Sequence, residues 1–272
     1  MPRYAIKVFY LGEKYHGFSI QPNARTVEGE LVRALIEGEY IKNRKSARIN
    51  YASRTDRGVN ALSQVVAFNS SKPPILMHIN SLLPPDIIVW ALASVKDNFN
   101  ARREALLRHY RYVLVSQSSL DLNAMREVSG LFLGVHDFRS FSADKKEVIR
   151  RIDSIKVTKR FSNVYYLDFI GPSFGRRMIL RITSALIGVG QRLLKPSDVE
   201  LALKGKRRLQ LKPVPAEGLI LYDMKYPPNI KFTVDRKALS LLKRRLENRL
   251  LTLMLKTEVS KCMLHSLSAF KY

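Results

Sequence analysis

Cysteine is almost absent from this sequence, and histidine is sparse. Cys262 is the only cysteine in 272 residues, so no disulfide can form within the chain, and the five histidines are scattered without the spacing of a zinc site. The longest apolar run, residues 87–93, is far too short to cross a bilayer, and the N-terminus does not resemble a signal peptide. We therefore expect no metal, no disulfide and no membrane span, and a reducing, cytoplasmic setting.

Acidic residues are also in short supply. The chain has 23 Asp and Glu against 47 Lys and Arg, which gives a net charge of +24. This charge is far larger than solubility alone requires. A polyanion is therefore the expected partner.

The hydrophobic pattern predicts two α+β halves. A helix is expected behind a Thr26 N-cap, another over about 176–194, a short one capped by Ser197, and a long basic one marked by leucines from Leu239 to Leu253. Alternating or branched-rich runs predict strands at 3–10, 47–52, 64–68, 87–95, 110–116, 152–158, 164–170 and 219–225. We place an N-terminal lobe at 1–105, a C-terminal lobe at 106–228 and a basic helical extension at 229–272.

A polar loop between two predicted strands carries the best candidate for chemistry. It reads Arg-Thr-Asp-Arg-Gly from Arg54 to Gly58. Asp and Gly close together are ordinary turn formers, so the loop by itself favours a turn over a catalytic Asp56. The surrounding sequence changes that interpretation.

The segment from Ser53 to Ala61, followed by Gln-Val-Val-Ala-Phe at 64–68, resembles the hallmark Gly-Arg-Thr-Asp-x-Gly-Val-His-Ala of the TruA family of tRNA pseudouridine synthases. Ser53 replaces the Gly and Asn60 replaces the His. Further segments resemble the family in the same order, with Phe18 where Trp is usual: 15–18, 21–23, 25–31, 99–102, 109–112, 136–141 and 216–219. The resemblance ends at about residue 228.

The resemblance implies an α+β fold of two lobes on a largely antiparallel sheet with flanking helices, meeting at a basic cleft with Asp56 in its floor. It also implies a homodimer that binds tRNA and, without a cofactor, isomerises uridines at positions 38–40 of the anticodon stem-loop. Asp56 would be the essential carboxylate, because positive character at the sugar C1′ is what an adjacent carboxylate stabilises or attacks. Whether it attacks the sugar, removes a sugar proton or adds to the base stays open.

The target uridine must leave its stack, and an aromatic ring can hold it there for about 1–3 kcal/mol. Tyr110 and Tyr112 share a strand face by alternation, and both suit an ordinary core. The resemblance implies that Tyr110 is the active-site ring.

A carboxylate in a closed pocket needs a cation to stay ionised. The family supplies an arginine from a Phe-x-x-x-Met-Val-Arg segment, but here Leu180 occupies that register. We predict that the adjacent Arg181 takes the role, with Arg177 or Arg176 as alternatives.

Other basic residues are candidates for phosphate contacts. Arg54 and Arg57 flank Asp56, and Arg102 belongs to the second motif. A further basic group consists of Lys204, Lys206, Arg207 and Arg208, for which a solvated surface is the simpler interpretation.

Three other functions compete with this interpretation. A pseudouridine synthase aimed at other RNA sites would use the same chemistry. A non-catalytic tRNA-binding protein would need the basic surface but not the Asp56 loop. A basic structural protein of ribosomes or chromatin would explain the charge but not the ordered motifs.

Overall fold

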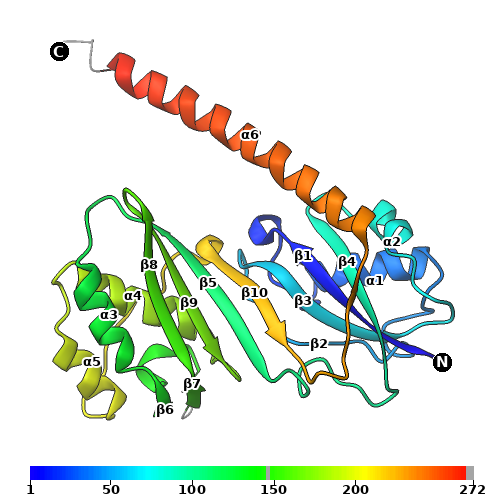
Figure 1. Ribbon diagram of the computed structural model, residues 1–272, viewed down its shortest axis with the longest axis horizontal. Helices are drawn as coiled ribbons and strands as arrows, with labels where there is room; N and C mark the ends of the chain where they lie inside the picture. Colours follow the sequence, from blue (N-terminus) through cyan, green and yellow to red (C-terminus); the bar gives the residue numbers. More distant parts are fainter. Residues whose placement is uncertain (145–147, 268–272) are drawn as a thin grey trace.

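A single large sheet runs through the whole molecule (Figure 1). The computed structural model describes residues 1–144 and 148–267. The order of the sheet is β11-β4-β1-β3-β10-β5-β9-β8, with β2 paired to β3, and β6 and β7 form a separate pair. The strands span Arg3–Tyr10 (β1), Asn50–Tyr51 (β2), Asn60–Asn69 (β3), Ile87–Val95 (β4), Leu107–Val115 (β5), Gly134–Asp137 (β6), Ile149–Ile152 (β7), Ser154–Phe161 (β8), Val164–Gly171 (β9), Leu219–Lys225 (β10) and Thr233–Val234 (β11).

The helices flank this sheet. They span Val27–Glu37 (α1), Leu76–Leu82 (α2), Leu122–Gly130 (α3), Met178–Gly190 (α4), Pro196–Leu203 (α5) and Arg236–Leu267 (α6). In Figure 1, α1 and α2 lie beside the strands of the N-terminal half, and α3, α4 and α5 lie beside those of the other half. The predicted α+β class with a largely antiparallel sheet is confirmed.

The central pairing of the sheet decides where the functional loop lies. All pairings are antiparallel except that of β10 with β3, which joins Ile220 to Asn60 and Leu221 to Ala61. Because parallel strands begin at the same edge of a sheet, the loops that lead into β3 and β10 meet there. The Asp56 loop therefore lies where the two halves of the chain join.

Several predicted elements have the predicted bounds, and others need correction. The strands at 3–10, 87–95 and 219–225 are confirmed, and Thr26 caps α1 by accepting a hydrogen bond of 3.2 Å from the Gly29 N–H. Ser197 is not a cap, because Pro196 already occupies the first turn of α5. The strand predicted at 47–52 is reduced to two residues, since Arg48 adopts a left-handed conformation with φ 48°.

Two further differences concern elements without strong sequence signals. The strand predicted at 152–158 divides into β7 and β8 at Asp153, whose N–H donates to the Ile170 carbonyl. The short helices α2 and α3 were not predicted. The Asp121 side chain caps α3 by accepting from the Ala124 N–H at 3.1 Å.

The predicted lobe boundaries at 105 and 228 fall in connections, and the division into lobes stays a prediction.

Charged side chains bridge neighbouring strands on β5 and β9. Asp168 accepts hydrogen bonds from Arg111 at 2.8 Å and contacts His109 Nε2 at 2.6 Å. The Arg111 guanidinium also lies 4.4 Å from the centre of the Tyr222 ring. Asp168 is only 9% exposed, so these partners compensate a buried charge.

The long helix α6 is held at its base and leaves the body (Figure 1). Asp235 accepts from the Ala238 N–H at 3.0 Å, which begins the helix, and Leu242 is buried against Phe9 and Ile88. Within residues 1–144 and 148–267, no helix combines the length and apolar character that crossing a membrane requires.

Candidate active site

A cleft of about 1030 Å³ opens beside the loop that carries Asp56. Its walls come from distant parts of the chain: the loop after β1, the Asp56 loop, the turn before β5, strand β7, the start of α4 and the segment before β10. Seven arginines and two carboxylates line it, namely Arg54, Arg57, Arg102, Arg108, Arg150, Arg176 and Arg177 with Asp56 and Asp144. The cleft is therefore strongly positive.

The Asp56 carboxylate has no competing partner in the described part of the chain. Asp56 is half-buried, and neither a side-chain hydrogen bond nor an ion pair to another described residue holds its oxygens. Its backbone carbonyl accepts from the Val59 N–H at 3.2 Å, which closes the turn. The carboxylate is thus available to a ligand in the cleft, while its backbone is fixed.

The first strand and its loop brace the residue before Asp56. The hydroxyls of Tyr10 and Thr55 share a buried hydrogen bond of 2.6 Å, and the Phe18 N–H donates to the Thr55 carbonyl at 3.1 Å. Gly17 has φ 104°, and a Cβ there would lie 2.9 Å from that same carbonyl oxygen. Only glycine allows this close approach.

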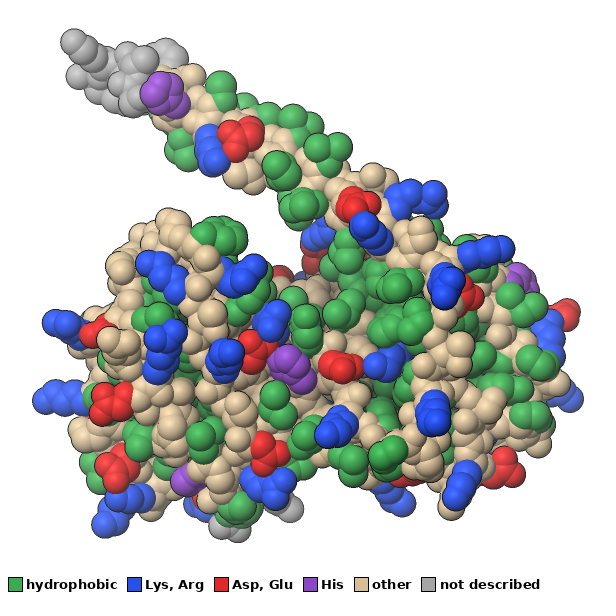
Figure 2. Space-filling model, viewed as in Figure 1, with side chains coloured by type: hydrophobic (Ala, Val, Ile, Leu, Met, Phe, Trp, Pro, Cys, Tyr) green, Lys and Arg blue, Asp and Glu red, His purple; other side chains and the backbone are tan. Residues whose placement is uncertain are grey.

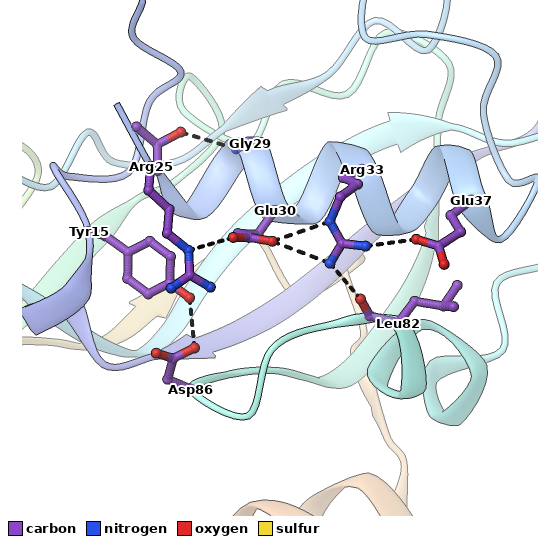
Figure 3. Close-up of polar contacts among 9 residues, drawn as sticks. Tyr15, Arg25, Gly29, Glu30, Arg33, Glu37, Leu82 and Asp86 are labelled. Atoms are coloured by element: carbon purple, nitrogen blue, oxygen red, sulfur yellow. Dashed lines mark hydrogen bonds and ion pairs between the residues drawn. The ribbon is translucent and has the colours of Figure 1, made fainter. Parts of the chain in front are cut away.

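A polar network fixes the bracing loop in turn (Figure 3). The buried Tyr15 donates its hydroxyl to Asp86 at 2.7 Å, and the Arg25 guanidinium lies 5.0 Å from the Tyr15 ring centre. Arg25 is paired with Glu30 of α1 at 2.6 Å. Because a hydrogen bond to a charged group contributes about 1.5–3 kcal/mol, this network ties the loop firmly to α1 and to the segment before β4.

Gln64, the glutamine that follows the loop in the sequence, holds the backbone before Asp56. Its amide N–H donates to the Ser53 carbonyl at 2.6 Å, and its Oε1 accepts from the Ser53 N–H at 3.1 Å. Gln64 is fully buried, so both bonds are shielded from water. The pair fixes the backbone three residues before Asp56.

Asn60, which replaces a family histidine, joins three segments. Its Oδ1 accepts from the Gly12 N–H at 2.9 Å, and its Nδ2 donates to the Glu217 carbonyl at 2.7 Å. Gly58 has φ 84°, and a Cβ there would lie 2.9 Å from Glu217. Asn60 therefore connects the end of the Asp56 loop to the segments that precede β10 and follow β1.

Tyr110 lies behind the wall of the cleft. Its ring is 6% exposed, its hydroxyl shares a hydrogen bond of 2.6 Å with Ser53 Oγ, and Phe174 packs edge-on against it with ring centres 5.5 Å apart. Burial raises the pKa of Tyr110, and the nearby Asp56 raises it further. Ser53 and Phe174 line the cleft in front of the neutral phenol.

Tyr112 is placed differently from Tyr110, although both belong to β5. Its hydroxyl donates to the Pro215 carbonyl at 3.1 Å, away from the Asp56 loop. Burial raises the pKa of Tyr112 to about 12, and Glu217 adds to this effect. Tyr112 supports the segment before β10.

The three arginines predicted to contact phosphates all line the cleft. Arg54, Arg57 and Arg102 are exposed, so their guanidinium groups are accessible at its rim. The basic group at the end of α5 lies elsewhere. Two of its members are paired on the surface, Lys204 with Glu200 and Arg207 with Asp198.

The predicted partner of Asp56 has another contact. Arg181 Nη1 donates to the Ser142 carbonyl, and no ion pair joins Arg181 to Asp56 in the described part of the chain. Leu180 is buried and lines the cleft, as its register indicates. Arg176 and Arg177, the predicted alternatives, line the cleft and are exposed.

Two arginines of the cleft were not singled out from the sequence. Arg108 is buried and donates to the carbonyls of Pro172, Ala52 and Arg102, so it is a structural residue. Arg150 is half-buried, and its Nε is shielded from solvent without a hydrogen-bond partner among the described residues. Arg108 could have been found by alternation from Tyr110, whereas Arg150 had no sequence signal.

The chemistry that this arrangement permits follows from its charges. A carboxylate open to the cleft can act on an electrophilic sugar carbon or as a base. The surrounding arginines can bind phosphate oxygens through planar, paired N–H groups. Both properties suit a reaction on a nucleotide within a polyanion.

Comparison with known proteins agrees with this chemistry. The family model described as tRNA pseudouridine synthase matches residues 129–227. A protein named tRNA pseudouridine synthase A from Methanothermobacter thermautotrophicus is 41% identical over 239 residues, covering 88% of this chain and 86% of that protein. The protein of the same name from Pyrococcus furiosus is 40% identical, covering 91% of this chain and 92% of its own length.

Likeness among solved structures is much lower. The crystal structure of the archaeal box H/ACA sRNP Nop10-Cbf5 complex matches with 12% identity and a TM-score of 0.35, covering 68% of this chain and 44% of that chain. That similarity is too low to support any assignment. At about 40% identity over almost their whole length, the sequence relatives do support one: this chain belongs to the tRNA pseudouridine synthase family and is an isomerase that acts on RNA.

Proposed function

We propose that this enzyme converts uridine to pseudouridine in tRNA, at positions 38–40 of the anticodon stem-loop, with Asp56 as its catalytic carboxylate. The observation that carries the proposal is the Asp56 carboxylate, unpaired among the described side chains, in a cleft with seven arginines. Relatives named tRNA pseudouridine synthase A support tRNA as the substrate. The net charge of +24 suits a large polyanion.

In the proposed reaction, the target uridine leaves its stack and enters the cleft. The glycosidic C–N bond breaks, the base turns over, and C5 of the base forms the new bond to C1′ while its proton is lost and N1 gains one. Atoms and electrons balance without a cofactor. Asp56 either stabilises C1′ as positive character develops there or bonds to it transiently.

The cation that favours the ionised carboxylate is, we propose, Arg150, which lines the cleft, with Arg181 as the alternative that its sequence position suggests. Each is half-buried, donates Nη1 to a backbone carbonyl and has a buried Nε without a hydrogen-bond partner among the described residues. Their charges are less screened by salt than those at the exposed rim and therefore act more strongly on a bound nucleotide.

The aromatic residues have separate proposed roles. Phe174 lines the cleft and can stack on the flipped base. Tyr110 supports Phe174 edge-on and holds Ser53, so it keeps the wall beside Asp56 in place. Contact of Tyr110 with the base itself stays a prediction, which requires Phe174 or Ser53 to move aside.

Arg54, Arg57 and Arg102 are proposed to bind the phosphates that flank the target nucleotide. They line the same cleft as Asp56 and are accessible. Because each phosphate contact releases counterions, tRNA affinity should fall steeply with salt.

The decisive experiment maps pseudouridine by position in unmodified tRNA transcripts after incubation with the wild type, Asp56→Asn and Asp144→Asn. Both changes remove one negative charge from the same cleft, so Asp144→Asn is a matched control. We expect modification at positions 38–40 with the wild type and the control, and none with Asp56→Asn, whose tRNA affinity should change little.

The alternatives give different outcomes in this assay. Modification at other positions would identify a synthase with another target. Tight tRNA binding without modification would identify a non-catalytic tRNA-binding protein. Substantial turnover by Asp56→Asn would remove Asp56 from the mechanism.

We also propose that the enzyme acts in the cytoplasm, as its single cysteine suggests, and that it forms a homodimer, as the resemblance to the TruA family implies. Because each copy has a net charge of +24, the proposed dimer requires a contact surface at which the two copies do not strongly repel each other.

A further inference from the structure

Ser53 places a hydroxyl group in the cleft beside Asp56. The TruA motif has glycine at this position, so the hydroxyl is not part of the family pattern. Ser53 is half-buried and lines the cleft three residues before Asp56. It therefore lies within the site of the proposed reaction, although it is neither a carboxylate nor one of the arginines.

The hydrogen bond between Tyr110 and Ser53 has a preferred direction. The two hydroxyl oxygens lie 2.6 Å apart, and Ser53 is the hydrogen-bond partner of the Tyr110 hydroxyl among the described residues. Tyr110 is 6% exposed, so a Ser53 donor would leave the phenol proton buried without an acceptor, which is costly. Burial also raises the pKa of Tyr110 and keeps the phenol protonated. Tyr110 is therefore the donor of this bond.

The Ser53 oxygen accepts from Tyr110, so its own O–H is free to donate into the cleft. A hydroxyl that accepts one hydrogen bond donates the next one more strongly, because the two bonds polarise each other. The backbone of Ser53 is also fixed, since its N–H and its carbonyl are both bonded to the buried Gln64 side chain, at 3.1 and 2.6 Å. The donor is thus held in place before a substrate binds.

Two other hydroxyl groups of the cleft wall are paired with tyrosines but are less accessible. Thr55 shares a buried hydrogen bond of 2.6 Å with Tyr10, and Ser19 shares one of 2.7 Å with Tyr51. Thr55 is 5% exposed and Ser19 is 8% exposed, whereas Ser53 is half-buried. Ser53 is therefore the hydroxyl of these three that a nucleotide in the cleft reaches most easily.

The proposed reaction creates a charge that such a donor stabilises. When the glycosidic bond breaks, its electron pair stays on the base, and resonance places part of the negative charge on the two carbonyl oxygens of uracil. A preorganised donor aimed at one of these oxygens stabilises the charge as it develops. Asp56 acts at the sugar in this step, so a separate group is needed at the base.

The charges on the protein surface have a different effect. Figure 2 shows Lys and Arg side chains spread over the visible face of the body. Charges distributed in this way attract the phosphates of RNA and raise affinity, but they do not select one atom of the base. Removal of the neutral Ser53 hydroxyl should therefore change the rate of the reaction and not the affinity for tRNA.

We propose that the Ser53 hydroxyl donates a hydrogen bond to a carbonyl oxygen of the target uracil and stabilises the base as the glycosidic bond breaks. The proton stays on Ser53 throughout, so no group is transferred. Tyr110 is a positioning residue in this step, because its hydroxyl acts through Ser53. The inference rests on the proposed function and adds a catalytic residue to it.

The test compares Ser53→Ala with Ser19→Ala in the full-length chain. Both changes remove a serine hydroxyl that is paired with a tyrosine in the same cleft. We expect Ser53→Ala to lower the single-turnover rate of pseudouridine formation at least about tenfold with unchanged tRNA affinity, and Ser19→Ala to retain the wild-type rate. Equal rates of the two variants would overturn the proposal. So would a loss of tRNA affinity in Ser53→Ala without a loss of rate.

A double variant separates catalysis from folding. Ser53→Ala leaves the Tyr110 hydroxyl without its partner, so this variant should unfold at a lower urea concentration than the wild type. Adding Tyr110→Phe removes that hydroxyl and should restore the stability, while the rate stays as low as in Ser53→Ala. A double variant that recovers the rate together with the stability would show that Ser53 is only structural.

Sulfur substitution identifies the oxygen that Ser53 contacts. Sulfur accepts hydrogen bonds more weakly than oxygen, so 2-thiouridine or 4-thiouridine at the target position weakens one carbonyl contact at a time. The thio base also has a different reactivity with every variant, so the quantity to compare is the ratio of the wild-type rate to the Ser53→Ala rate. We expect this ratio to fall towards one with one of the two substrates. An unchanged ratio with both substrates would overturn the proposal.

The same assays distinguish this inference from the proposed function. A wild type that forms no pseudouridine would contradict both. A wild type that forms pseudouridine through Asp56 without any dependence on Ser53 would contradict the inference alone and leave the proposed function intact.

Discussion

Substitution of Gly17 tests whether the loop after β1 determines the position of Asp56. Gly17 has φ 104°, and an added Cβ would lie 2.9 Å from the Thr55 carbonyl oxygen and 3.4 Å from the Asp56 carbonyl carbon. In Gly17→Ala, either the bracing loop or the Asp56 loop must therefore move. Because Asp86 and Glu30 anchor the bracing loop through Tyr15 and Arg25, that loop cannot absorb the whole displacement, and the Asp56 loop should shift as well.

The size of the effect follows from two terms. A non-glycine residue in this backbone region costs about 1–3 kcal/mol, and overpacking against the carbonyl costs about 1–3 kcal/mol more. Relaxation of the loops reduces the sum, so we expect a loss of stability of about 2–4 kcal/mol. A displacement of a catalytic group by about 1 Å can lower the rate about a hundredfold. Turnover should therefore fall at least tenfold, with little change in tRNA affinity.

Urea unfolding and single-turnover pseudouridine formation measure the two effects. Gly130→Ala is the matched control, because an added Cβ there has no atom within 4 Å. Its stability should change by less than about 1 kcal/mol and its turnover should equal that of the wild type. A Gly17→Ala enzyme as stable and as active as Gly130→Ala would refute the bracing role.

The other predictions concern charge and the buried rings. Arg150→Ala should lower the single-turnover rate more than Arg181→Ala, because Arg150 lines the cleft; the reverse order would assign the cation beside Asp56 to Arg181. Tyr110→Ala should lose far more single-turnover rate than Tyr112→Ala, because only Tyr110 supports the wall beside the catalytic carboxylate; equal losses would contradict this. Burial alone would raise the pKa of Asp168, but its histidine and arginine partners outweigh burial and lower it. Because the pKa of Asp168 is lower in the folded state than in the unfolded state, its carboxylate stabilises the protein above about pH 4, and this contribution is lost as the pH falls further. Urea unfolding should therefore show a larger decrease in the free energy of unfolding between pH 7 and pH 3 for the wild type than for Asp168→Asn.

The local periodicity of the sequence was sufficient to predict most strands of the sheet. The alternation from Tyr4 to Tyr10 and the branched run at 87–95 specify strands by themselves, and both have the predicted bounds. The parallel pairing of β10 with β3 could not be predicted, because it joins segments about 160 residues apart whose individual patterns do not state a partner. That one pairing brings the Asp56 loop against the segment before β10.

Residues that line the cleft were identified from the sequence where they belong to one short motif and were missed where the fold brings them there from elsewhere. The loop from Arg54 to Arg57 and the second-motif residue Arg102 all line the cleft, because each belongs to a short motif. Arg150 comes from β7, which has no motif, and the fold brings it to the same cleft as the start of α4. The role of Arg181 stays a prediction: one of its donors contacts the Ser142 carbonyl, and its Nε has no hydrogen-bond partner among the described residues.

The two departures from the family motif are compatible with an intact site, because the side chains of Ser53 and Asn60 both form hydrogen bonds that hold the residues around Asp56. With glycine at position 53, the buried hydroxyl of Tyr110 would have no hydrogen-bond partner among the described residues, which costs about 1–3 kcal/mol; Ser53 Oγ satisfies it at 2.6 Å. Asn60 offers one acceptor and one donor, and it uses them on the Gly12 N–H and the Glu217 carbonyl. Ser53 and Asn60 thus hold the loop around Asp56 without placing a group on its carboxylate, so the chemistry that the loop can perform is left open to a ligand.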